Sequence, residues 1–154
     1  MCDIVEDLQE NLKLVLEAFE LPEEILQESY AEGKWNVRYL LHHIVDAETV
    51  LYERIRRIIA EERPVIWAFD QDLWAENLHY QTKSLEKAKI LFAAVREHII
   101  DLADRHYDVR GGREYVHSED GVGTLADEFD KVVWHAEDHL ERIQEVIEAY
   151  HNAD

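Results

Sequence analysis

Apolar residues recur every three or four positions in four long stretches of the chain, which is the spacing of one buried face of an α-helix. The stretches expected to be helical cover residues 4–19, 36–62, 84–104 and 124–147. Asn36 is placed to cap the second stretch, and Thr124 with Asp127 forms a capping-box pattern at the start of the fourth. Pro22 and Pro64 follow the first two stretches, where proline stops a helix. Four amphipathic helices of this length predict an all-α four-helix bundle.

The connections between these helices indicate how they are arranged. The second connection, residues 63–83, is long enough when extended to return along a whole helix of ~30 Å. Helices two and three can therefore be parallel, which gives an up-down-down-up bundle with a long crossover. The crossover is rich in aromatic residues, which we expect to cover one edge of the bundle. Residues 106–123 contain two glycine-rich turns and can form a short hairpin or remain irregular.

Composition narrows the class of protein. A chain of 154 residues with 47% hydrophobic residues, five Gly and two Pro is expected to form one helical domain, residues 1–154. The net charge of -19 opposes binding to nucleic acids or to anionic membranes. Cys2 is the only cysteine, so no intramolecular disulfide can form. No apolar run reaches the length of a membrane span and no signal peptide is evident, so a cytoplasmic location is expected.

Two histidines four residues apart, His135 and His139, carry the strongest chemical signal. On a helix they lie one above the other and can bind one cation, and a histidine from the Leu41-His42-His43-Ile44 segment can supply a third ligand. Three protein ligands leave a position open for water or a substrate thiolate. Such a pair also arises by chance in a chain with nine histidines. It is not a metalloprotease motif, because alanine rather than glutamate follows the first histidine.

Helical geometry selects between the two adjacent histidines. At 100° per residue, His43 falls about 100° from the centre of its apolar stripe and His42 about 160° away, so His43 is the better ligand candidate. His139 and His135 fall about 65° and 105° from the apolar centre of their own helix. The other histidines are expected at the surface, and His117 alone lies in a loop that could fold over the site.

Five segments in order resemble the DinB-like superfamily, in particular its YfiT-like branch. They are residues 33–38, 41–48, 52–54, 64–74 and 134–139, within a match that extends from about Gly33 to Ile147. The resemblance implies an up-down-down-up bundle, usually dimeric, with a divalent metal on His43, His135 and His139. Members of known activity transfer low-molecular-weight thiols such as bacillithiol or mycothiol, or act as isomerases, and others are assigned as hydrolases. Where the branch often has further histidines in its last motif, this chain has Glu137 and Asp138.

Three imidazoles with an open position suit zinc or nickel, because a metal on neutral ligands keeps its positive charge and lowers the pKa of a bound water or thiol. The chain is therefore interpreted as a metal-dependent thiol S-transferase or hydrolase that acts on a small molecule. That it acts as a homodimer is implied by the resemblance alone. No nucleophilic triad is needed, and Cys2 near the terminus is a poor nucleophile candidate. A non-enzymatic metal-binding or stress-response interaction module stays open as the alternative. A di-iron centre is rejected, because every Glu-x-x-His pair falls in a loop or at the chain end.

Three residues are candidates for a substrate pocket. Arg54 is on the same flank as His43 and could hold an anionic group, although a surface salt bridge to the many nearby acids is the favoured interpretation. Asp70 and Trp74 match recurring positions of the family in the crossover, where they could line the pocket or serve as packing.

Overall fold

The computed structural model describes residues 3–153, and most of them are helical. The helices are α1 (Asp3–Ala18), α2 (Glu23–Leu26), α3 (Val37–Ala60), α4 (Gln71–Asn77), α5 (Leu85–Arg110) and α6 (Leu125–His151). The strands are β1 (Val65–Ile66), β2 (Glu114–His117) and β3 (Gly121–Thr124). Cys2 lies outside the described residues. No helix within them combines the length and hydrophobicity needed to cross a membrane.

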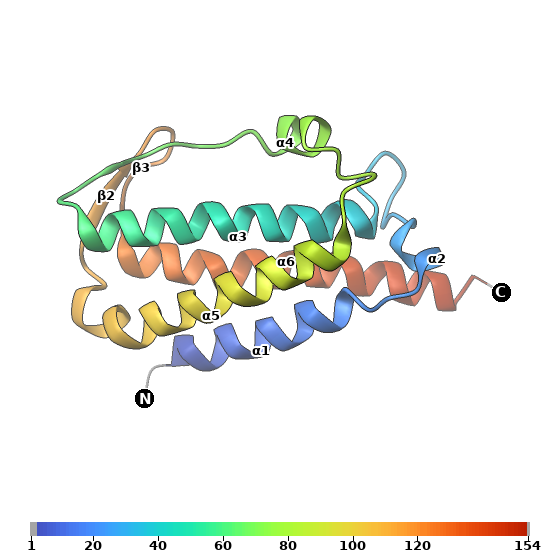
Figure 1. Ribbon diagram of the computed structural model, residues 1–154, viewed down its shortest axis with the longest axis horizontal. Helices are drawn as coiled ribbons and strands as arrows, with labels where there is room; N and C mark the ends of the chain where they lie inside the picture. The colour runs from blue at the N-terminus through green and yellow to red at the C-terminus, as the bar shows by residue number, and fades with distance from the viewer. Residues whose placement is uncertain (1–2, 154) are drawn as a thin grey trace.

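The four long helices form the expected bundle. In Figure 1, α1 and α6 run in one direction and α3 and α5 in the other, so the order is up-down-down-up. The long connection after α3 returns along the outside of the bundle to the start of α5, as the length of residues 63–83 predicted. The prediction of an all-α four-helix bundle is confirmed.

Local capping explains where three of the long helices begin. The Asn36 side chain accepts a hydrogen bond from the Tyr39 amide, and Ser84 accepts one from the Lys87 amide. Thr124 and Asp127 form a reciprocal capping box at the start of α6. These contacts satisfy amides that have no partner inside the helix. The predicted caps at Asn36 and Thr124 are confirmed, whereas α5 continues to Arg110, beyond the predicted end at residue 104.

A small sheet closes one end of the bundle. β2 and β3 form an antiparallel hairpin, and β1 of the crossover pairs with β2 in parallel. Tyr115 faces Gly123 across the hairpin, and a Cβ at this glycine would meet the Tyr115 ring at 2.5 Å. Glycine therefore lets the ring lie flat over the neighbouring strand, where its hydroxyl reaches the buried Glu128. The sequence predicted the hairpin as one of two alternatives and did not predict β1.

The crossover buries the outer side of α3. Every residue from Leu41 to Glu48 is buried, although only one side of α3 faces the bundle. Tyr80 is fully buried, and its hydroxyl donates to Asp46 on α3. Arg38 donates to the carbonyl oxygens of Tyr80 and Lys83, which fixes the end of the crossover against the helix. Residues 63–83, between α3 and α5, thus pack over the helix that carries His43, and we call this segment the strap.

Candidate metal centre

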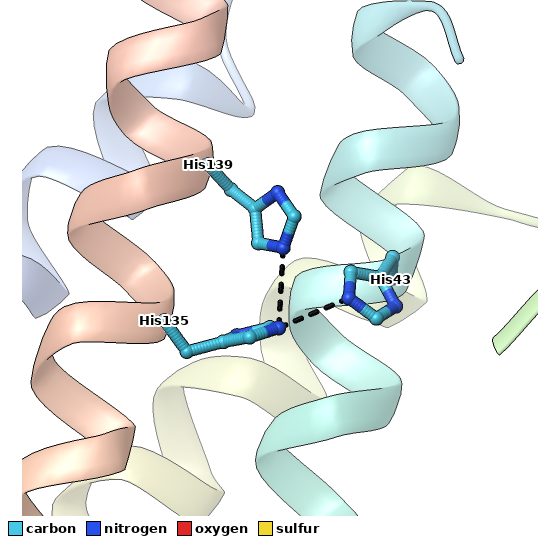
Figure 2. Close-up of side chains that lie close together, drawn as sticks. All are labelled: His43, His135 and His139. Atoms are coloured by element: carbon cyan, nitrogen blue, oxygen red, sulfur yellow. Dashed lines mark hydrogen bonds between the residues drawn. The ribbon is translucent and has the colours of Figure 1, made fainter. Parts of the chain in front are cut away.

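Three histidines from two helices meet at one point. His43 comes from α3, and His135 and His139 come from successive turns of α6, which packs beside α3 (Figure 2). The Nε2 atom of His135 lies 3.0 Å from Nε2 of His43 and 3.1 Å from Nε2 of His139. The structure therefore brings together the three histidines that the sequence singled out.

The spacing of these nitrogens fits a shared metal ion. In a tetrahedral site with bonds of about 2.0 to 2.1 Å, ligand nitrogens lie about 3.3 to 3.4 Å apart. Two of the three Nε2 distances are a few tenths of an ångström shorter than this, and the three ligand atoms all lie within 4.8 Å of one another. Small side-chain rotations would bring all three to bonding distance of one ion.

The three rings are held as neutral imidazoles. Burial, with the nearby His139, lowers the pKa of His43 to about 3. Burial is also the main reason why the pKa of His135 falls to about 2, with further contributions from His139 and His43. Burial likewise lowers the pKa of His139. A neutral imidazole presents a lone pair, and this is the form that binds a metal.

The surroundings of the Nδ1 atoms, which lie on the other side of each ring from its neighbours in the cluster, are also defined. In a metal-bound neutral imidazole the proton is on the other nitrogen, which usually donates to a carboxylate, a carbonyl or a water. The Nδ1 atoms of His43 and His139 are buried and lack a hydrogen-bond partner within residues 3–153. The rings are positioned instead by aromatic packing, since Trp35 lies 5.2 Å and Phe69 6.4 Å from His43 between ring centroids.

His42 has a different role from its neighbour. Its Nε2 lies 3.1 Å from the carbonyl oxygen of Lys83, and its ring packs 5.3 Å from that of Tyr80. Burial, with the nearby Arg38, lowers the pKa of His42 to about 4. The helical wheel placed this residue far from the apolar stripe, yet it is only 1% exposed, because the strap covers that side of α3.

A pocket of about 440 Å³ borders the cluster at His139. Its charged lining residues are two cations, Lys34 and Arg142, and two carboxylates, Asp72 and Asp138. No other histidine or acidic side chain of residues 3–153 belongs to the three-histidine cluster. Within these residues no fourth protein ligand completes the cluster, and of its three histidines His139 borders the pocket. Arg142 follows His139 by less than one helical turn, a spacing visible in the sequence. Lys34, from the loop before α3, and Asp72, from the first turn of α4, are brought here by the tertiary fold and could not be predicted.

The three predicted pocket residues lie elsewhere. Arg54 is 5% exposed rather than at the surface, and it donates to the carbonyl oxygen of Trp67. Asp70 is exposed, and its carboxylate caps α4 by accepting from the amides of Asp72 and Leu73. Trp74 packs against Phe69, with ring centroids 4.8 Å apart. None of the three lines the pocket beside His139.

His117 is a correction to the sequence expectation. It lies on β2, paired in register with Ile66 of β1, and is 7% exposed rather than at the surface. Its Nδ1 accepts from the amides of Glu119 and Asp120, so it stabilises the turn of the hairpin. His117 is paired on both sides, with Ile66 of β1 and Gly121 of β3, and the pairing with β1 was not predicted.

Comparison with known proteins identifies the family of this chain. A family model described as the DinB superfamily matches residues 7–143. The chain belongs to the DinB superfamily. A relative from Oceanobacillus iheyensis, named provisionally as a metal-dependent hydrolase, is 34% identical over 130 residues, which cover 80% of this chain and 71% of the relative. A second protein from that organism with the same provisional name is 31% identical over 139 residues, covering 90% of this chain and 79% of its own.

A solved structure shares the fold of this DinB superfamily member. It is YfiT from Bacillus subtilis, described as a metal-dependent hydrolase of provisional assignment with an unusual four-helix bundle topology. The superposition has a TM-score of 0.89 at 24% identity and covers 97% of this chain and 86% of YfiT. The bundle order seen here is thus shared over the matched 86% of that structure.

Proposed function

We propose that His43, His135 and His139 bind one divalent metal, zinc or nickel, and that the protein is a metal-dependent enzyme acting on a small molecule. The observation that carries this proposal is the convergence of three neutral Nε2 atoms beside a pocket of about 440 Å³. The provisional naming of two relatives as metal-dependent hydrolases supports the same class of reaction.

The reaction class follows from the donor set. When bound, a divalent metal with an open position lowers the pKa of a coordinated water or low-molecular-weight thiol, so that a nucleophile forms near neutral pH. The chain itself holds the three imidazoles neutral and in place through burial. Trp35 and Phe69 pack beside His43 and keep solvent from that ring. Hydrolysis and thiol S-transfer both fit this arrangement, and they differ only in the nucleophile.

The pocket beside His139 is the proposed place for the substrate. Arg142 is held there by Glu145 at 3.1 Å and lies over the ring of Tyr30, with its guanidinium carbon 5.4 Å from the ring centroid. Asp138 neighbours His139 in the sequence and lines the same pocket. This mixture of charges favours a small polar substrate over an apolar one.

The experiment that tests the proposal compares the two nucleophiles in one assay. The protein is loaded with zinc or nickel and given a panel of esters and amides, and separately a panel of electrophiles with a low-molecular-weight thiol. We expect turnover in one panel that is lost on chelation, is restored by adding metal, and is absent in His135→Ala. If the metal-loaded protein turns over neither panel, the hypothesis that it is an enzyme is wrong. The alternative, a non-enzymatic metal-binding or stress-response interaction module, is then favoured.

We extend the proposal to assembly and location on the basis of the family resemblance. The protein is proposed to act as a homodimer in the cytoplasm. Light scattering at micromolar concentration should give twice the mass of the 18.2 kDa chain, and a monomer mass would contradict the homodimer.

A further inference from the structure

A second pocket lies under the strap and contains two arginines. Its volume is about 490 Å³, and its walls come from the outer side of α3, from β1 and from α4. Arg54 and Arg57 line it from α3, and Val65, Trp67 and Trp74 line it from the strap. We call it the arginine pocket. It shares no lining residue with the pocket beside His139.

Arg54 is buried without a full set of partners. Its side chain is 7% exposed, and its Nη2 donates one hydrogen bond, of 2.7 Å, to the carbonyl oxygen of Trp67. Its Nη1 forms an ion pair with the buried Glu128 carboxylate at 4.0 Å, but this distance is too long for a hydrogen bond, so the pair leaves the N–H donors of Nη1 unused. A guanidinium has five N–H donors, so most of the donors of Arg54 are not used by residues 3–153. A buried cation in this state favours an anionic ligand in the adjoining cavity.

Arg57 adds a second guanidinium that a ligand can recruit. It donates to Glu53, which also lines the pocket, and to Glu61 at 3.4 Å. The side chains of Arg57 and Glu53 are 42% and 47% exposed, and exposed ion pairs of this kind contribute little free energy. An anion entering the pocket can therefore replace Glu53 as the partner of Arg57.

The strap supplies apolar surface beside these cations. Trp67 is 74% exposed and Val65 52%, although both line the pocket. Indole rings that remain accessible next to guanidinium groups suit a ligand with a flat apolar body and a charged end. The net charge of the protein is -19, so the two guanidinium groups in this pocket have the opposite sign to the molecule as a whole.

We propose that the arginine pocket binds a small organic anion, a carboxylate or a phosphate monoester, through Arg54 and Arg57, with its apolar body against Trp67 and Trp74. The site goes beyond the proposed metal chemistry and needs no metal. It is connected to the metal centre through α3, which carries both sets of residues, and through ring packing, from Trp74 to Phe69 at 4.8 Å and from Phe69 to His43 at 6.4 Å.

Calorimetric titration of the full chain tests this site. The probes are benzoate and phenyl phosphate, with benzyl alcohol as the uncharged counterpart and inorganic phosphate as the anion without an apolar body. Each titration is run with and without prior chelation, so that binding to a metal at the histidines is recognised. We expect at least one aromatic anion to bind at millimolar concentration in both states and more tightly than benzyl alcohol and inorganic phosphate. The preferred probe distinguishes a carboxylate from a phosphate ligand.

Variants assign the binding to the pocket. Arg54→Gln and Arg57→Gln should each lower the affinity for the preferred anion, by roughly tenfold for Arg54→Gln, because a charge-assisted contact is lost. Glu53→Gln should raise the affinity for the same anion, because a competing carboxylate is removed. Arg56→Gln, which removes a guanidinium of α3 outside the pocket, is the matched control and should bind as the wild type.

Three results would overturn the proposal. They are the absence of anion binding, equal binding of benzyl alcohol, and unchanged affinity in Arg57→Gln and Glu53→Gln. These two substitutions are at exposed positions, so the test stands even if Arg54→Gln does not fold. Because the titration of the chelated chain involves no metal, failure here and failure of the proposed enzymatic function are seen separately.

Discussion

The buried ion pair between Arg96 on α5 and Glu48 on α3 gives a sharp test of how the bundle is held together. Arg96 is fully buried and binds both carboxylate oxygens of Glu48, one of them at 3.0 Å, while its Nη1 donates to the carbonyl oxygen of Leu8 at 3.0 Å. The guanidinium thus joins α1, α3 and α5 in the core. It is also close enough to His135 to contribute to the lowered pKa of that residue.

Arg96→Met leaves the Glu48 carboxyl buried without its partner. Removing one member of a buried pair costs about 3 to 5 kcal/mol of unfolding free energy. Glu48→Leu combined with Arg96→Met removes both charges and should recover most of that loss, leaving about 1 kcal/mol for the lost bond to Leu8. Urea unfolding of the metal-free protein, followed by circular dichroism, gives the four free energies of the double-mutant cycle.

The pH dependence of the single variant gives an independent check. Burial raises the pKa of Glu48, and Arg96 opposes this. Without Arg96 the folded state holds a proton on Glu48 to higher pH than the unfolded state does, so the variant loses stability as the pH rises. The cost of Arg96→Met should therefore be larger at about pH 8 than at about pH 5. A cost below about 1 kcal/mol, or a double variant as unstable as the sum of the two single ones, would refute the reasoning.

Three further predictions concern the histidines, the cap at the start of α6 and the hydrogen bond from Tyr115 to the first turns of α6. The metal-free protein should lose stability as the pH falls below 6.5, because His43 and His135 have lowered pKa values and protonate first in the unfolded chain; urea unfolding should show about 1.4 kcal/mol per pH unit for each. Thr124→Ala should cost about 1 kcal/mol in thermal unfolding through loss of the capping box. Tyr115→Phe should cost about 1 to 3 kcal/mol in urea, because the fully buried Glu128 loses its 2.6 Å hydrogen bond.

Features encoded by short-range pattern could be predicted from the sequence. The caps at Asn36 and Thr124 depend on residues three positions away, and the four helices depend on apolar periodicity within each stretch. The i,i+4 spacing of His135 and His139 on one helix has the same local origin. These features needed no knowledge of distant contacts.

The crossover and its cover over one edge of the bundle were predicted, but which residues of α3 it buries could not be. A helical wheel records only the apolar stripe, so it placed His42 opposite the core. The many acids near Arg54 favoured a surface salt bridge for that residue. Both are buried because residues from the strap cover the outer side of α3, through Tyr80 for His42 and Trp67 for Arg54. α4 and β1 are short and have no periodic pattern long enough to be recognised.

The metal content of the purified protein and of four histidine variants tests the central claim most directly. Elemental analysis should find one zinc or nickel per chain in the wild type. The metal should be lost in His43→Ala, His135→Ala and His139→Ala, while the helical circular dichroism remains. His42→Asn is the matched control, since this buried histidine bonds to the Lys83 carbonyl and should leave the metal in place. Wild-type protein without metal, or loss of metal in His42→Asn equal to that in the other three, would contradict the account.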